Sequence, residues 1–177
     1  GYKKMIKGII FDLDGVIVST DHYHYLAWKS LADELHIPFD QKDNERLRGV
    51  SRMESLEIIL EKSTETYTDD QKKDFAQKKN TLYQEYLRNM TPEDLSSEVK
   101  ETLENLRTKG FKLAVGSSSK NTMLILKQIG LDHFFDAISD GTMIEYSKPH
   151  PEVFLLAAKK LGINPKECLV VEDAEAG

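Results

Sequence analysis

The sequence predicts an α/β fold in which a doubly wound parallel-sheet core carries an inserted α-helical cap. Three short apolar runs that stop at polar residues are expected strands: 9–11, 111–115 and 168–171. A weaker run at 135–140 is a fourth expected strand. Helical patterns separate the later strands, at 99–109, 121–129 and 151–161. Strands that alternate with helices form βαβ units, so we expect a parallel, Rossmann-like sheet.

The first expected strand stands apart, because a long stretch without a convincing strand separates it from the second. Within that stretch, apolar positions at helical spacing predict three helices: 23–35, 52–62 and 70–88. We expect residues 19–91 to form the cap, and residues 1–18 and 92–177 the core, with a return hinge at 91–94. Ligands of open parallel sheets bind beyond the carboxyl ends of the strands, so the cap is expected to cover the binding crevice.

Composition excludes several classes of protein. With 24 basic and 30 acidic residues, the net charge of −6 provides no footprint for nucleic acid or an anionic membrane. The single cysteine, Cys168, excludes an intramolecular disulfide and a multi-cysteine metal site. No run reaches the roughly 18 apolar residues of a membrane helix, and none resembles a signal peptide. We therefore expect a cytoplasmic, monomeric protein whose partner is a small molecule, with no nucleic acid and no membrane.

Polar residues that suit phosphate or metal binding follow the expected strands. These are Asp12 and Asp14, then Ser117 and Ser119, then Lys148, and finally Glu172 and Asp173. Taken alone, the Asp-x-Asp-Gly segment is equally typical of a turn. No Gly-x-Gly-x-x-Gly follows a strand, which excludes dinucleotide binding of that type.

The acids at the strand ends predict a magnesium site and a phosphate-ester substrate. Like-charge repulsion among Asp12, Asp14, Glu172 and Asp173 would be relieved by a cation, and hard oxygen ligands suit Mg²⁺. Phosphoryl transfer requires in-line positioning and neutralisation of the equatorial oxygens. Lys148 and the Ser117 hydroxyl fit that second task, with Asp12 as a nucleophile that forms an aspartyl phosphate.

In order and spacing, these residues resemble the four motifs of the haloacid dehalogenase superfamily of phosphotransferases. The resemblance implies that Asp12 is the nucleophile and Asp14 the general acid and base, with a backbone carbonyl on the metal. It further implies that Ser117 and Lys148 bind phosphate, and that Glu172 and Asp173 complete the magnesium site. The family continues through another helix and strand, so the C-terminal part of the core is expected to be missing beyond Gly177. Leu169, Val170 and Val171 are then expected to lack covering partners.

Segments of the expected cap and of the second strand end resemble the β-phosphoglucomutase family, which interconverts β-glucose 1-phosphate and glucose 6-phosphate. The substrate-binding residues so implied are His24, Trp28, Arg48, Gly49, Val50, Ser51, Arg52, Ser119, Lys120 and Asn121. In that family an aspartyl phosphate and a sugar bisphosphate are intermediates, which requires a second anion site. Arg52, Ser119, Lys120 and Asn121 match it. Arg48 stands where the family commonly has lysine, which keeps the charge but changes its geometry.

Simpler interpretations stand beside these. Core packing accounts for Trp28 as well as sugar contact does, and His24 has the alternative of a surface histidine. Arg48 and Arg52 have the alternative of two solvated helix charges, and the Lys78-Lys79 pair is expected on an exposed face. The alternative functions are a magnesium-dependent sugar-phosphate phosphatase and, from another class, a receiver-type signalling module. Receivers lack a cap.

Overall fold

The computed structural model describes residues 5–173, and the chain folds as two compact units. One unit contains the residues up to Ser19 together with those from Arg88 onward, and the other contains Thr20–Leu87. The limits expected from the sequence lie close to this division, at 18/19 and 91/92 rather than 19/20 and 87/88. As domain limits they stay a prediction.

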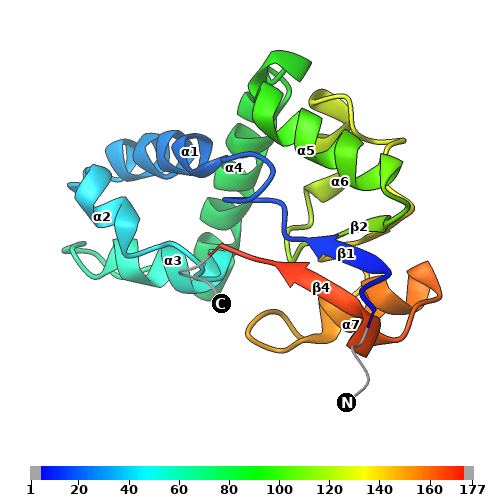
Figure 1. The fold of residues 1–177 in the computed structure, drawn as a ribbon. Coiled ribbons are helices and arrows are strands. Elements are labelled where there is room, and N and C mark those ends of the chain that lie inside the picture. The colour runs from blue at the N-terminus through cyan, green and yellow to red at the C-terminus, as the bar shows by residue number, and fades with distance from the viewer. Residues whose placement is uncertain (1–4, 174–177) are drawn as a thin grey trace. The chain divides into compact units, whose positions relative to one another are not determined.

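The larger unit, the core unit, is built on a parallel sheet with the strand order β3-β2-β1-β4 (Figure 1). The strands are β1 (Gly8–Phe11), β2 (Lys112–Gly116), β3 (Ala137–Ser139) and β4 (Cys168–Val171). All of β1 and most of β2 are buried, as expected for apolar runs inside a sheet that is covered on both faces. The predicted α/β class and the parallel sheet are confirmed.

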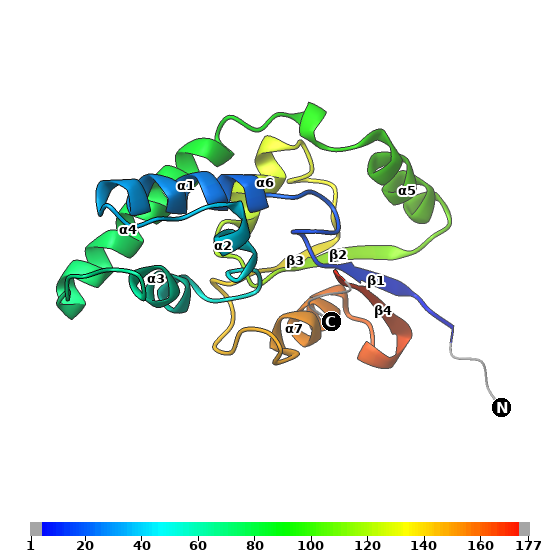
Figure 2. The same ribbon diagram turned by 90° about the vertical axis from the view of Figure 1, so that its left-hand side faces the viewer.

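Helices cover both faces of this sheet (Figure 2). The helices of the core unit are α5 (Ser97–Thr108), α6 (Thr122–Gln128) and α7 (Glu152–Leu161). Helix α7 packs on β1, β2 and β3, where Ile10, Ala114 and Ala157 form one apolar cluster, and α5 packs on β2 from the opposite face. Two 3₁₀ turns, η1 (Pro92–Asp94) and η2 (Pro165–Glu167), complete the unit, and η1 occupies the expected return hinge.

Strand β4 has apolar side chains open to solvent in the described part of the chain. Leu169 is 51% exposed and Val170 is 36% exposed, whereas Ile9 and Ile10 on the neighbouring β1 are buried. Exposure of these side chains agrees with the expectation from the sequence. Val171 is only partly exposed.

The smaller unit, the cap unit, contains helices joined by loops and no strand among residues 20–87. Its helices are α1 (Asp21–Glu34), α2 (Gln41–Glu45), α3 (Arg52–Leu60) and α4 (Asp69–Leu87). Trp28, Leu31, Leu56 and Ile59 are among the residues of its own apolar core. Helix α2 was not predicted, because five residues are too short to show periodicity. A capping box formed by Asp40 and Asp43 holds its first turn.

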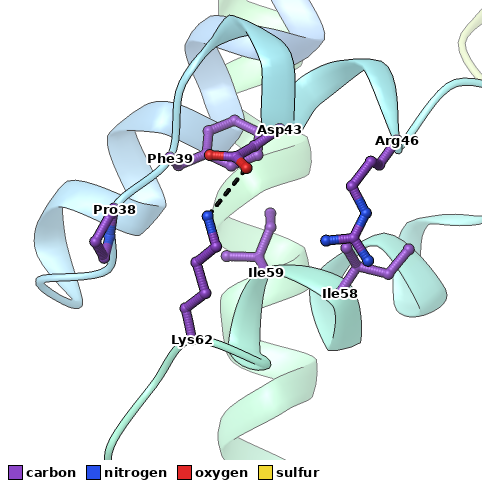
Figure 3. Close-up of a pocket in the computed structure, with 7 residues that line it drawn as sticks. All are labelled: Pro38, Phe39, Asp43, Arg46, Ile58, Ile59 and Lys62. Atoms are coloured by element: carbon purple, nitrogen blue, oxygen red, sulfur yellow. Dashed lines mark hydrogen bonds and ion pairs between the residues drawn. The ribbon is translucent and has the colours of Figure 1, made fainter.

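A small cavity of about 10 Å³ lies within the cap unit, between α2 and α3 (Figure 3). Phe39, Ile58 and Ile59 supply its apolar wall, and the ion pair between Lys62 Nζ and Asp43 Oδ1, 3.0 Å, lies beside it. This volume holds about one water molecule, so the cavity does not accommodate a sugar phosphate.

Over residues 5–173, no helix combines the length and the apolar character that crossing a bilayer requires.

Candidate active site

Asp12 is held at the carboxyl end of β1 by contacts on each side of its carboxylate. The Nζ atom of Lys148 lies 2.8 Å from Oδ2, and the Leu13 backbone N–H donates to Oδ1 at 2.8 Å. The Asp12 N–H donates to the Val171 carbonyl at 2.9 Å, which ties the end of β1 to the end of β4. The residue is only 8% exposed. The structure therefore brings together a nearly buried carboxylate and an ammonium group, as the sequence predicts for Asp12 and Lys148.

Asp14 lies in the tight turn that follows β1, where it is exposed and forms a bridge with Val18. The turn depends on Gly15, whose φ of +82° lies in the left-handed region and whose N–H donates to the Val18 carbonyl at 2.8 Å. The Asp173 carboxylate lies so close to Gly15 that a Cβ at this position would overlap it. Gly15 is therefore required both for its left-handed φ and for the close approach of Asp173. This approach places Asp173 against the turn that carries Asp14.

Two successive hydrogen bonds shape the loop between β2 and α6, and they join Ser117, Ser119 and Asn121. Ser117 is buried, and its N–H donates to the Ser139 carbonyl at 3.0 Å. Its Oγ accepts the Ser119 N–H at 3.2 Å, and the Ser119 Oγ accepts the Asn121 N–H at 3.1 Å. Lys120 is exposed. The same hydroxyls that are expected to hold phosphate therefore also fix the shape of this loop.

The acids at the strand ends fit a magnesium ion better as a small set than as the four-carboxylate cluster expected from the sequence. Among residues 5–173, no three His, Cys, Asp or Glu side chains lie close enough together to share a metal. Magnesium is usually bound by one or two carboxylates, with water and substrate oxygens completing its octahedron. Asp12 and Asp173 border the turn at Gly15 and meet that requirement, and both Glu172 and Asp173 are partly exposed.

A second cationic group lies inside the cap unit, where Lys79 of α4 faces α1. Its Nζ lies 2.7 Å from Nδ1 of His24, 4.8 Å from the ring centre of Trp28 and 4.6 Å from that of Tyr83. The His24 ring stacks on Tyr83 with a centroid separation of 3.9 Å. Arg52, the first residue of α3, donates to Oδ1 of Asn80 at 3.1 Å. Over the described chain, neither Lys79 nor Arg52 has a carboxylate within 4.0 Å.

The electrostatics of this group follow from burial and from like charge. Burial, followed by repulsion from Arg52, lowers the pKa of Lys79 from 10.5 to about 7. Burial also lowers the pKa of His24 well below its ordinary value, with Lys79 and Arg52 adding to the effect. The pKa of Arg52 is lowered by burial alone. His24 is therefore a neutral imidazole near pH 7, with Nδ1 able to accept a hydrogen from Lys79.

The expectation that Lys79 lies on an exposed face is wrong: the residue is 3% exposed. Its neighbour Lys78 is exposed, as expected, and pairs with Glu34 at 3.2 Å. The sequence does contain a signal for this difference. Ala76, Tyr83 and Leu87 form a stripe at helical spacing, and position 79 belongs to the same side of α4.

The remaining cap residues predicted from the sequence lie just before α3, except Trp28, which belongs to α1. Arg48 is exposed and pairs with Asp21 at 3.6 Å, so it has a carboxylate partner, whereas Arg52 has none within the described part of the chain. Gly49 has a φ of +73°, Val50 is partly buried, and the Ser51 Oγ caps α3 by accepting the Glu54 N–H. Trp28 is 2% exposed and belongs to the apolar core of the cap while its ring faces Lys79. Core packing is therefore part of its role.

A parallel sheet that ends in a carboxylate–lysine pair, a buried serine hydroxyl and a further acid suits an enzyme that acts on phosphoryl groups. The chain belongs to the haloacid dehalogenase-like hydrolases, whose family model matches residues 6–177. It is 44% identical to the β-phosphoglucomutase of Bacillus subtilis over 97% of this chain and 77% of that protein.

Solved structures and more distant relatives agree with this family. A crystal structure of β-phosphoglucomutase from Clostridium difficile matches 98% of this chain and 78% of that one, with a TM-score of 0.85 and 41% identity. The phosphorylated carbohydrates phosphatase of Thermotoga maritima is 27% identical over 97% of this chain and 78% of that protein. The relatives therefore include both mutases and phosphatases.

Proposed function

We propose that this chain is a magnesium-dependent β-phosphoglucomutase that interconverts β-glucose 1-phosphate and glucose 6-phosphate. The observation that carries the proposal is the second cationic group, in which Lys79 and Arg52 are wholly or partly buried and have no acidic partner among residues 5–173. Burying a cation without an anion is unfavourable, so such a pair is best explained by an anionic ligand. A sugar bisphosphate needs two anion sites, whereas a phosphatase needs one.

The proposed chemistry takes place at Asp12. The Asp12 carboxylate, already an aspartyl phosphate at the start of a cycle, gives its phosphoryl group to the 6-hydroxyl of β-glucose 1-phosphate. The hydroxyl proton goes to Asp14, the O–P bond to Asp12 breaks, and β-glucose 1,6-bisphosphate forms. After the bisphosphate has turned round, Asp12 attacks the phosphorus at C1. Asp14 returns the proton to the leaving oxygen, and glucose 6-phosphate is released.

The other site residues bind the two phosphate groups and offset their negative charge during these two transfers. Lys148 and the Ser117 hydroxyl neutralise the transferring phosphoryl group. The phosphate that is not being transferred has five proposed ligands: Arg52, Lys79, Ser119, Lys120 and Asn121. His24 and Trp28 contact the sugar next to Lys79. Asp12, the Asp14 carbonyl and Asp173, with Glu172 beside them, would hold a magnesium ion, which would neutralise negative charge on the phosphoryl oxygens.

A sugar-phosphate phosphatase is the second candidate, because the Thermotoga maritima relative and the fructose-1-phosphate phosphatase of Escherichia coli, 28% identical, are phosphatases. In that case water replaces the sugar hydroxyl as the acceptor. The chain should be incubated with β-glucose 1-phosphate, Mg²⁺ and a trace of the bisphosphate, with both products followed. We expect glucose 6-phosphate to accumulate without inorganic phosphate. Release of one phosphate per sugar phosphate consumed would establish the phosphatase instead.

A further inference from the structure

The loop that carries Lys148 is braced by the first residue of α7. The two oxygens of the Glu152 carboxylate accept backbone N–H groups from the loop, Oε1 from Glu145 at 2.8 Å and Oε2 from Tyr146 at 2.9 Å. These two hydrogen bonds lower the pKa of Glu152, so the group is a carboxylate at neutral pH. Glu152 thus uses both of its oxygens on the backbone just before Lys148.

The same residue is also tied to the loop on the other side of Lys148. The Glu152 N–H donates to Nδ1 of His150 at 3.1 Å, and the His150 N–H donates to the Ser147 carbonyl at 3.1 Å. The rings of His150 and Tyr146 lie 5.0 Å apart. Lys148 therefore sits between two segments that both connect to Glu152.

Phe154, two residues further along α7, contacts the Lys148 side chain itself. The Phe154 ring centre lies 4.7 Å from the Lys148 Nζ, within the range of a cation–π contact. The same ring fills the space beside Gly116, where a Cβ would lie 2.8 Å from it. The start of α7 therefore braces the loop on both sides of Lys148 through Glu152 and contacts the Lys148 side chain through Phe154.

We propose that Glu152 is a positioning residue for phosphoryl transfer, acting through the Lys148 loop to hold the ammonium group against Asp12. The inference rests on the proposed function only in taking Lys148 as the group that neutralises the transferring phosphate. A free lysine side chain populates many rotamers, and its electrostatic value in a transition state depends on its being placed in advance. Glu152 supplies that placement without touching the reacting atoms.

The test compares E152A and E152Q with a matched control, D136N. Asp136 also accepts a backbone N–H, that of Leu113 at 2.9 Å, but at the opposite end of β2 from Ser117. The rate of Asp12 phosphorylation by acetyl phosphate should fall roughly 10- to 100-fold in E152A, as expected for a misplaced group. E152Q, which keeps one acceptor oxygen, should lose less. D136N should keep the wild-type rate, with thermal unfolding recorded for every variant.

Two further readouts separate positioning from a general structural defect. In a K148A background, E152A should cause no additional loss of rate, because the group it positions is gone. Acetylation of Lys148 by a water-soluble N-hydroxysuccinimide ester, measured by mass spectrometry, should speed up several-fold in E152A and stay unchanged in D136N.

The outcomes also distinguish this inference from the proposed function. If the wild type takes no label from acetyl phosphate, the proposed function fails, and the acetylation of Lys148 alone decides the role of Glu152. If the wild type is labelled and E152A matches D136N in both rate and acetylation, the positioning role is overturned. An undiminished effect of E152A in the K148A background would overturn it as well.

Discussion

The ammonium nitrogen of Lys79 lies 2.7 Å from Nδ1 of His24, inside a helical unit that offers it no carboxylate within 4.0 Å over the described residues. A lysine buried in this way destabilises the free protein in its charged form. An anion bound beside Lys79 and Arg52 would offset this cost. The cost to stability can be measured without any substrate.

Folding lowers the pKa of Lys79 from 10.5 to about 7, so the stability of the cap unit should depend on pH. Between these values the unfolded chain holds more protons than the folded one, and stability should rise with pH by up to roughly 1.4 kcal/mol per unit. Below pH 7 the unfavourable contribution is constant. Substitution K79M should remove this slope and stabilise the unit at pH 7.

Trp28 is the only tryptophan of the chain and lies beside Lys79, so its fluorescence reports the unfolding of this unit. Urea titrations at several pH values between 7 and 9.5 give the slope. K78M is the matched control, because Lys78 is exposed and pairs with Glu34. A wild-type slope equal to that of K79M would show that Lys79 is not buried as a cation.

A second stability prediction concerns the hydroxyl of Tyr83, which donates to Oγ1 of Thr20 at 2.9 Å in a buried position. Substitution Y83F keeps the ring stacked on His24 and removes the hydroxyl that makes this hydrogen bond. We expect the free energy of unfolding to fall by about 0.5–1.5 kcal/mol. In Y67F, the control, a long and exposed bond of 3.4 Å to Glu65 is lost, and the change should be smaller. If Y83F and Y67F lose the same free energy of unfolding, the buried hydrogen bond does not stabilise the unit more than the exposed one.

The strands and most helices were predictable, because local patterns determine them. Residues 9–11, 111–115 and 168–171 are apolar runs long enough for a buried strand, and β1, β2 and β4 are found there within about a residue. The short helix α2 escaped prediction, since its capping box at Asp40 and Asp43 carries no hydrophobic period.

The candidate site also has a part that the sequence predicts and a part that it does not. The carboxylate–lysine pair at Asp12 and Lys148 follows from strand ends meeting at one edge of a parallel sheet. The burial of Lys79 does not follow from the two adjacent lysines alone, because it is the packing of α4 on α1 that buries one of them. Glu152 gave no signal, since its role depends on hydrogen bonds to the backbone of a loop.

Asp12 is predicted to be the residue that accepts the phosphoryl group. D12N keeps the shape of the side chain and removes the attacking charge, so labelling by acetyl phosphate should fall below detection. The labelled wild-type peptide should contain Asp12, and hydroxylamine should release the label, as expected of an acyl phosphate. Labelling of D12N at the wild-type level would place the nucleophile elsewhere.

Magnesium dependence should track Asp173, whose carboxylate borders the turn at Gly15. Labelling of Asp12 should stop on addition of a chelator and return with excess Mg²⁺. In D173N the Mg²⁺ concentration that gives half the maximal rate should rise by about tenfold or more, as expected when a ligand-sphere group is lost. D136N, which changes a carboxylate remote from this turn, should leave it unchanged. Labelling that is insensitive to the chelator would remove magnesium from the proposal.

The division between two phosphate sites is tested by comparing R52A with K148A in two reactions. Acetyl phosphate has no second phosphate to hold, so R52A should leave the labelling of Asp12 nearly intact. Its mutase turnover should fall roughly 10- to 150-fold, the equivalent of about 1.5–3 kcal/mol for a lost charged hydrogen bond.

K148A should instead depress both reactions, because the charge at the transferring phosphoryl group is common to them. Arg48 provides a second comparison within the cap unit: it is exposed and already pairs with Asp21, so R48A should cost less turnover than R52A. Equal losses in labelling and turnover for R52A would contradict the two-site division. The remaining account would then be a phosphatase whose cap arginine acts on the fold rather than on a second phosphate.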